Sequence, residues 1–503
     1  MCSFCTKTGV SSIQKGGGLL KTVRWKKWVP AAAAAACLAL SGCGAGTGQN
    51  AGDRLNAIVW GVPMLFLMAA VGGCLTIRTG GIQFRRFGHI MRMTVGRLFN
   101  GTTAGSGEIT PFQALSTAMA GTIGTGSIAG VVSAITMGGP GALFWMWVTA
   151  LVGMMTKFSE VLLSVHFREK TPAGNWVGGA MYFIKNGLGK NWTWLATAFA
   201  LFGMIACFGI GAMVQANAIS VNLTKACSVP GWVTALGLLF FAGIVLVGGV
   251  KRVGAVAGKL VPFMAALYVI MCLIIIFMHI DRVPSVFWWV VSDAFTPTAA
   301  QGGFVGASVM MAIRMGMARG VFSNEAGLGS APMAHAASTA ESPLVQASIG
   351  MLDVFIDTII VCSMTGFVIL VSLDPAGQPL WSSGMSGGVL TASAFQHNLP
   401  GFGEYGVTFC LTLFAFTTAL GWCVYGERCV IYLFGDKAQK PFRVIYVCVV
   451  ALGAVLALDL VWLLADIGNA LMAFPNIIGI LLLSPTLFKI VREEVKKDPR
   501  FVL

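Results

Sequence analysis

Long apolar runs are the feature of this sequence that most limits how the chain can fold. Several of them reach the ~20 residues that a helix needs to cross the apolar core of a bilayer. They recur along the chain as Val59–Ile77, Ala142–Met155, Ala235–Gly249, Leu260–Ile280 and the segment around Ile477–Leu483. Only 10% of the 503 residues are charged and 56% are hydrophobic, whereas soluble domains are about 25% charged. We therefore predict an all-α polytopic membrane protein that lies in a lipid bilayer.

The basic residues indicate orientation, although a net charge of +14 could also suggest a nucleic-acid partner. They occur in short clusters between apolar runs and form no single basic face, so we expect no nucleic-acid binding. The clusters are Arg78–Arg97, Lys251–Arg252, Lys437–Arg443 and Lys489–Lys497. Because basic loops stay on the cytoplasmic side of a membrane, these four places are predicted to be cytoplasmic.

Residues 1–43 end in a pattern that resembles a bacterial export signal. A basic stretch, Lys21–Lys27, is followed by an apolar stretch, Val29–Leu40, and then by Leu40-Ser41-Gly42-Cys43, which has the form of a lipobox. Cleavage before Cys43 with lipid attachment, an uncleaved N-terminal helix and a mis-assigned start codon all explain this pattern. We favour cleavage or removal of the segment.

The rest of the chain predicts about eleven transmembrane helices. They span approximately 55–77, 109–136, 141–166, 193–221, 231–249, 255–280, 304–334, 344–372, 403–434, 442–461 and 463–489. The first must start outside, because the basic cluster that follows it is cytoplasmic, and an odd number of spans then leaves the C-terminus inside. The predicted parts are a first span with a basic loop (44–107), five spans (108–280), an outer loop (281–303), five spans (304–489) and a tail (490–503).

Two glycine clusters interrupt the second and the seventh of these spans. The first is Gly121-Thr122-Ile123-Gly124-Thr125-Gly126-Ser127, and the second is Phe322-Ser323-Asn324-Glu325 followed by Gly327-Leu328-Gly329-Ser330. At membrane depth, such breaks are tolerated only where the backbone lines a cavity or is buried in protein. The two spans run in opposite directions and each opens a unit of five, which is typical of inverted-repeat secondary transporters with a site at the breaks. We predict a five-plus-five inverted repeat with one extra N-terminal helix.

The backbone at such a break can bind both ends of a zwitterion. Amides that begin the outer half-helix have no acceptor in their own helix and suit a carboxylate; here they belong to Thr125, Gly126 and Ser127. Carbonyls that end the inner half-helix, near Ala120 and Ile123, offer oxygen to a hard cation or to an ammonium group.

Side chains on other spans extend this candidate site. Thr417 and Thr418 could supply hydroxyl ligands to sodium, and Trp422 lies on the same helix face as Thr418. Gln215 is a polar amide in an apolar span and could bind an ammonium or a carboxylate. Each has a structural alternative: a membrane Thr often bonds its own helix, Trp often anchors at the interface, and Gln often joins helices.

Ionisable residues inside the spans are functional hypotheses by default. Lys157 and Glu160 are one helical step apart, and Asp353 and Asp357 share a face, so we expect structural pairing for both sets. Glu427-Arg428 is expected to form a structural ion pair near the cytoplasmic end of its span.

Four segments give the chain a resemblance to a known family. They are Gly124-Thr125-Gly126-Ser127-Ile128-Ala129-Gly130-Val131, Gly138-Gly139-Pro140-Gly141-Ala142-Leu143-Phe144-Trp145-Met146-Trp147, the string from Arg319 to Pro332, and Gly421-Trp422 with Gly426-Glu427-Arg428. With these segments the chain resembles the alanine or glycine:cation symporter family, which shares the leucine-transporter fold, over about residues 55 to 490.

The resemblance implies sodium-coupled uptake of alanine, glycine or a close relative by alternating access across a bacterial inner membrane, with a single chain as the functional unit. It implies a substrate site made of Thr122, Thr125, Gly126, Gln215, Phe322, Thr418 and Trp422. It also implies a sodium site made of the carbonyls of Ala120 and Ile123 and the hydroxyls of Thr417 and Thr418.

Two positions depart from the family pattern. The family usually has Asn where this chain has Ser127 and Ala212, so substrate choice could differ.

Other classes of function fit the sequence less well. The segment Gly384-Met385-Ser386-Gly387-Gly388 matches the GxSxG motif of hydrolases, but it lacks the strand-to-helix elbow that this motif needs, so an enzyme is disfavoured. A passive channel would need a continuous lined pore. A proton-coupled symporter or an exchanger of another small amino acid is the nearest alternative.

Overall fold

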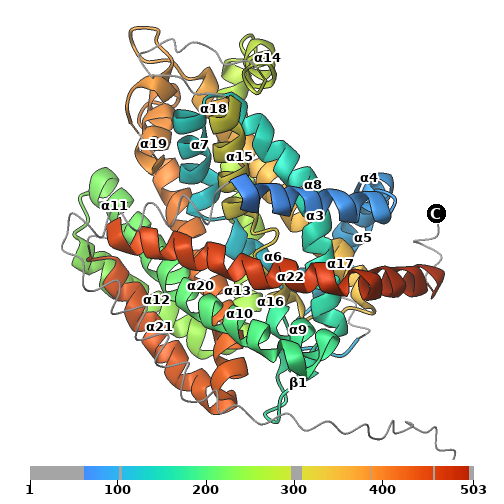
Figure 1. Cartoon of the computed structure of the whole chain (residues 1–503). Helices are drawn as coiled ribbons and strands as arrows, with labels where there is room; N and C mark the ends of the chain where they lie inside the picture. Colours follow the sequence, from blue (N-terminus) through green and yellow to red (C-terminus); the bar gives the residue numbers. More distant parts are fainter. Residues whose placement is uncertain (1–61, 101–104, 296–308, 386, 457–458, 498–503) are drawn as a thin grey trace, which may run out of the picture. The chain divides into compact units, whose positions relative to one another are not determined.

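The computed structural model describes residues 62–100, 105–295, 309–385, 387–456 and 459–497 (Figure 1). The chain divides into two compact units, Met1–Gly52 and Asp53–Leu503, and all described residues belong to the second. The signal-like segment at 1–43 and residues 498–503 of the predicted tail therefore lie outside the described residues.

The described part of the chain is almost entirely helical. Its helices are α3 Val62–Arg78, α4 Ile82–Arg85, α5 Phe87–Asn100, α6 Pro111–Thr122, η2 Gly126–Gly130, α7 Val131–Gly138, α8 Gly141–His166, α9 Ala180–Leu188, η3 Lys190–Trp192, α10 Thr193–Ala206, η4 Cys207–Met213, α11 Val214–Cys227, α12 Gly231–Val247, α13 Gly249–Met278, α14 Val283–Asp293, α15 Val309–Asn324, α16 Pro332–His335, α17 Pro343–Val354, η5 Phe355–Cys362, α18 Ser363–Val371, η6 Leu380–Ser382, α19 Gly387–Asn398, α20 Gly403–Phe434, η7 Asp436–Ala438, α21 Gln439–Gly453 and α22 Asp459–Lys497. Two short strands, β1 Glu169–Lys170 and β2 Trp176–Val177, pair antiparallel.

Six helical segments of the described residues are long and apolar enough to cross a membrane. They are Gly141–His166, Lys190–Cys227, Gly249–Met278, Pro343–Val371, Gly403–Phe434 and Ile467–Lys497. The bent pair Pro111–Thr122 and Gly126–Gly138 adds a seventh if it is one span, and Met64–Arg78 and Gly231–Val247 are shorter apolar helices. The prediction of a multi-pass, all-α membrane protein is therefore confirmed.

Some predicted span boundaries agree with the structure, and others differ by several residues. α8 and α20 have the predicted bounds, 141–166 and 403–434, whereas α21 ends at Gly453 and not at 461. In the span predicted at 304–334, α15 ends at Asn324, inside the glycine cluster that predicted a break there. Glu325, Gly327 and Gly329 then have φ values of 55°, 94° and 78°, which no right-handed helix can contain.

Burial separates a central set of helices from a peripheral set. In α8 and α20, 83% and 78% of the spanning window is buried, against 39% in α13. α13 exposes large apolar side chains such as Phe263, Ile270 and Phe277, as expected of a helix that faces lipid. α8 packs against α15, α17 and α3, and α20 packs against α6, α10, α11 and α13 (Figure 1). The broken helices thus lie beside the most buried helices of the chain.

A backbone connection joins the start of α6 to the segment that follows α16. Ile109 and Ser338 form a parallel bridge. Arg168, just beyond α8, donates hydrogen bonds to the carbonyls of Ser106 at 2.8 Å, Ala336 at 2.9 Å and Ser338 at 2.7 Å. The segment before the first broken helix and the segment after the second are therefore hydrogen-bonded together.

Candidate functional site

The first break lies between α6 and α7, where the glycine cluster predicted it. α6 starts with a capping box, in which Thr110 and Gln113 each accept a hydrogen bond from the other's backbone amide. The helix stops at Thr122, and Ile123 has the non-helical angles φ −75° and ψ 89°. A helix resumes at Thr125 with the π-helical turn η2, and the two halves are bent by 52°. The first amides of the resumed helix consequently have no acceptor within their own helix.

Glycine is required at the first break because other helices approach its backbone closely. A Cβ atom on Gly121 would lie 2.6 Å from the Tyr425 hydroxyl, and one on Gly124 would collide with the Thr418 hydroxyl, both on α20. A Cβ atom on Gly126 would lie 3.1 Å from the ring of Phe322. The break is thus enclosed by α20 on one side and by the last turn of α15 on the other.

The second break runs from Glu325 to Ala331, between α15 and α16. Asn324 accepts a hydrogen bond from the amide of Ala326 at 3.0 Å, and Ser330 donates to Glu325 at 2.6 Å. Outside this loop, Glu160 on α8 accepts from the amide of Gly329 at 3.1 Å. The polar groups of this break are therefore largely bonded to side chains of the protein.

Of the predicted sodium ligands, the structure brings Ile123 and Thr418 together. The Thr418 hydroxyl lies 3.5 Å from the carbonyl oxygen of Ile123 and donates to the carbonyl of Phe414 at 2.9 Å. Thr417 donates to two carbonyls of its own helix at 3.0 Å, and its hydroxyl lies 3.4 Å from the sulfur of Met264 on α13. Thr417 and Thr418 therefore both bond to carbonyls of their own helix, which was the structural alternative. Thr418 also reaches the first break. Ala120 is fully buried.

Trp422 and Gln215 lie near each other through η4. Trp422 is buried, its ring is 5.5 Å from that of Tyr425, and it packs so closely on Gly211 in η4 that a Cβ atom there would collide with it. The side chain of Trp422 also faces the carboxyl group of Glu325 at the second break. Gln215, just after η4, donates to the carbonyl of Ile210 at 3.1 Å. Trp422 thus connects the region of η4 with the second break.

Two buried oxygens in the predicted substrate site have no hydrogen-bond partner among the described residues. They are the hydroxyl of Thr125 and the carbonyl Oε1 of Gln215, and both residues are 3% exposed. Buried polar atoms are nearly always paired with protein, water or ligand. Thr125 lies at the first break and Gln215 on α11, so a polar ligand that reached both atoms would satisfy them.

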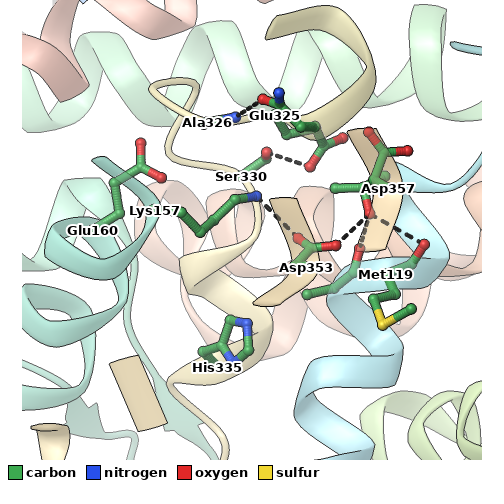
Figure 2. A network of polar contacts seen from close by, with 12 residues as sticks. Met119, Lys157, Glu160, Glu325, Ala326, Ser330, His335, Asp353 and Asp357 are labelled. Atoms are coloured by element: carbon green, nitrogen blue, oxygen red, sulfur yellow. Dashed lines mark hydrogen bonds and ion pairs between the residues drawn. The ribbon is translucent and has the colours of Figure 1, made fainter. Parts of the chain in front are cut away.

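The remaining predicted residues contact other parts of the site. Phe322 packs on Gly126. Thr122 donates its hydroxyl to Asp353 on α17 at 2.6 Å, and Lys157 on α8 pairs with the other carboxylate oxygen of Asp353 at 3.1 Å (Figure 2). The hydroxyl of Thr122 is therefore already bonded within the protein.

Acidic partners of the first break were missed by the sequence reasoning. Asp357 accepts hydrogen bonds from Ser127 at 2.6 Å, from Ser323 at 3.0 Å and from Thr358 at 2.9 Å. The four-residue spacing of Asp353 and Asp357 predicted a shared face, and structural pairing is what both show. Their partners on α6, η2 and α15 could not be read from that spacing. Ser127 and Ala212 are the two residues that depart from the family pattern. The hydroxyl of Ser127 donates to Asp357, and Ala212 is buried in η4.

The predicted ion pair at the end of α20 is more extended than expected. Glu427 bonds to Arg443 at 2.5 Å and to Gln439 at 2.6 Å. Arg428 lies 3.9 Å from Glu427 and 3.7 Å from Glu108, which precedes α6. The closest partner of Glu427 is therefore on α21 and not the adjacent Arg428.

Helices broken inside an apolar bundle, with buried polar atoms gathered at the breaks, define a membrane transport protein. Comparison with known sequences gives the family. The model of the sodium:alanine symporter family matches residues 46–499, and the chain belongs to this family. The family is a transporter family, so the protein is not an enzyme.

Two relatives cover most of the chain. An uncharacterized transporter from Haemophilus influenzae is 46% identical over 447 residues, which are 88% of this chain and 94% of the relative. The sodium/alanine symporter AgcS from Methanococcus maripaludis is 42% identical over 437 residues, 86% of this chain and 94% of the relative. Among solved structures, a mutant of the Eremococcus coleocola manganese transporter matches with a TM-score of 0.42 and 12% identity, covering 75% of this chain and 71% of that one.

Proposed function

We propose that this protein takes up small neutral amino acids, alanine and glycine, together with sodium across a bacterial inner membrane. The family membership and the name of the relative AgcS support this substrate class and this coupling ion. The observation that carries the proposal is the first break. There the carbonyl of Ile123 and the hydroxyl of Thr418 meet beside backbone amides that begin a new half-helix.

The substrate carboxylate would bind to the amides of Thr125 and Gly126, at the positive end of the resumed helix. The unpartnered oxygens of Thr125 and Gln215 would accept from its ammonium group. Phe322 and Trp422 would cover the small apolar side chain. Thr122 would contribute through its main chain, because its hydroxyl donates to Asp353.

Sodium would bind to oxygen atoms that carry no net charge. The carbonyls of Ala120 and Ile123 and the hydroxyls of Thr417 and Thr418 form this set. A hydroxyl that donates its hydrogen to its own helix keeps lone pairs for a cation, so the observed bonds of Thr417 and Thr418 are compatible with the role.

The transport cycle would rest on a five-plus-five inverted repeat. One unit is 108–280 and the other 304–489, with the extra first span and its basic loop at 44–107, about eleven spans in all, the N-terminus outside and the C-terminus inside. The occurrence of one broken helix near the start of each unit supports this arrangement. A single chain would be the functional unit.

Uptake by proteoliposomes tests the proposal directly. Labelled alanine or glycine should accumulate against its gradient when sodium is higher outside, and this accumulation should stop when potassium replaces sodium. Accumulation driven by a pH gradient without sodium would instead identify a proton-coupled symporter. Flux that appears only with amino acid on both sides would identify an exchanger, and unsaturable downhill flux a channel.

A further inference from the structure

The carboxyl group of Glu160 is bonded on one side only. Its Oε1 atom accepts from the amide of Gly329 at 3.1 Å and from the side-chain amide of Asn476 at 2.5 Å. Its Oε2 atom is buried and has no hydrogen-bond partner within the described residues. The amide of Gly327 approaches the same carboxyl group without bonding to Oε2. The two oxygens of Glu160 therefore behave as chemically different atoms.

Three other buried acids, Asp353, Asp357 and Glu427, do not show this asymmetry. Asp353 accepts from Thr122 on one oxygen and from Lys157 on the other. Asp357 accepts on both oxygens, and so does Glu427. A carboxylate has two equivalent acceptor oxygens, whereas a carboxylic acid has one carbonyl acceptor and one hydroxyl donor. An Oε2 atom that accepts no hydrogen bond from the described residues fits the hydroxyl of an acid better than a carboxylate oxygen.

The orientation of Asn476 on α22 is fixed by its neighbours. Its Nδ2 atom donates to Glu160 and also to the carbonyl of Gly327 at 2.9 Å. Both partners are acceptors, so the nitrogen and not the oxygen must face them. The Oδ1 atom of Asn476 is then left buried without a donor among the residues that the structure places.

A single proton resolves both unpartnered atoms. We propose that Glu160 and Asn476 form a proton-binding site, in which a proton on Oε2 of Glu160 is donated to Oδ1 of Asn476. Together with the bond from Nδ2 to Oε1, this gives a cyclic carboxylic acid–amide pair with every polar atom satisfied. The ligand is a proton from the aqueous phase, and its binding converts a buried carboxylate into a neutral acid.

The surrounding charges favour this assignment. The charged group that faces Glu160 is Lys157, on the same helix α8. Lys157 in turn faces Asp353 on α17 and Glu325 at the second break, and His335 on α16 lies near it. Lys157 is already paired with Asp353, and His335 is bonded to Gln346. Figure 2 shows Lys157 reaching toward Asp353 while Glu160 diverges from it. An ionised Glu160 would place a third buried carboxylate, after Asp353 and Glu325, around the single cation of Lys157, which is costly in a protein interior.

The proton would brace the second break. Glu160 and Asn476 together hold the amide of Gly329 and the carbonyl of Gly327, and both glycines have positive φ. Loss of the proton would leave Oε2 of Glu160 and Oδ1 of Asn476 as two facing acceptors that repel each other, and this would weaken the bonds to Gly327 and Gly329. The inference concerns the second break and stands independently of the sodium and amino-acid sites proposed at the first.

Infrared spectroscopy of the purified full-length protein in detergent tests the proposal. The carbonyl stretching band of a protonated carboxylic acid is separate from the bands of a carboxylate. At neutral pH, Glu160→Gln should remove intensity from the protonated-acid band and leave the carboxylate band unchanged. The control Asp353→Asn, in the same cluster, should reduce the carboxylate band instead. Loss of carboxylate intensity in Glu160→Gln would show that Glu160 is ionised and would overturn the proposal.

A second variant keeps the proposal testable if Glu160→Gln does not fold. Asn476→Ala removes the acceptor for the acid proton, so the protonated-acid band should shift toward that of an unbonded acid. An unshifted band would rule out Asn476 as the partner and would leave a buried water as the alternative acceptor.

Discussion

The two broken helices differ in how the polar groups at the break are hydrogen-bonded. At the first break, side-chain hydroxyls of the broken segment itself donate outward, from Thr122 to Asp353 and from Ser127 to Asp357. At the second break, side chains of other helices reach inward to the backbone, from Glu160 to Gly329 and from Asn476 to Gly327. The first break is held mainly by its own side chains, while Thr365 and Thr418 reach two of its carbonyls; the amides that begin the resumed helix are left for the ligand that we propose there. The second has its backbone bonded by the protein, which suits a supporting element better than a binding site.

The largest effect on folding stability is expected at Lys157 on α8, which pairs with Asp353, the acceptor of Thr122 at the first break. Lys157→Met leaves Asp353 as a buried carboxylate without its cation, which costs roughly 3–5 kcal/mol of folding free energy. Thermal unfolding in detergent should show a large drop in stability. The exposed pair Lys489–Glu493 provides the control, since Lys489→Met should change stability by less than about 1 kcal/mol. Partial rescue is expected in the double variant Lys157→Met/Asp353→Asn, and no rescue would contradict the pairing.

The backbone of the second break should be the next most sensitive feature. Gly329→Ala places a Cβ atom 2.8 Å from Asn476 at a φ of 78°, so strain and a collision add to about 2–4 kcal/mol. Gly384→Ala has a similar φ of 81° but no atom within 4 Å, and it should cost only about 1–2 kcal/mol. Equal losses in unfolding experiments would show that the hold on the second break contributes nothing.

Sodium dependence should separate the first break from the rest of α20. Thr418→Ala removes a proposed sodium ligand, and we expect the sodium concentration for half-maximal uptake to rise about tenfold, or ~1.4 kcal/mol. Thr412→Ala is the matched control, because Thr412 bonds to its own helix at 2.8 Å and has no proposed ligand. An unchanged sodium dependence in Thr418→Ala would remove this residue from the sodium site.

The smallest effect is expected on substrate affinity. Gln215→Ala removes the unpartnered Oε1 atom, and the alanine concentration for half-maximal uptake should rise about fivefold, or ~1 kcal/mol, with the sodium dependence preserved. Asn217→Ala, two residues further on, removes a bond to the carbonyl of Leu456 on the exposed side and should leave uptake unchanged. Similar results from both variants would assign Gln215 a structural role.

Local chemistry made the breaks predictable from sequence, and distant pairing made their partners unpredictable. Clustered glycines at membrane depth indicated both breaks, because an interior glycine weakens a helix wherever it stands. The second predicted cluster also contains the positive φ angles of Glu325, Gly327 and Gly329, although Glu is a residue type that rarely adopts them. Lys157 and Asp353 are 196 positions apart, and nothing local indicates which acid a buried lysine will meet. The short helices α14 and α19 and the β1–β2 hairpin were also missed, since they lie in predicted loops.

The hydrogen-bonded join between Ile109 and Ser338, clamped by Arg168, has a mechanical consequence. The segment that leads into α6 and the segment that follows α16 are coupled, and neither can move without the other while those bonds hold. Any rearrangement at one of the broken helices must therefore displace both segments together or break the bonds that Arg168 donates.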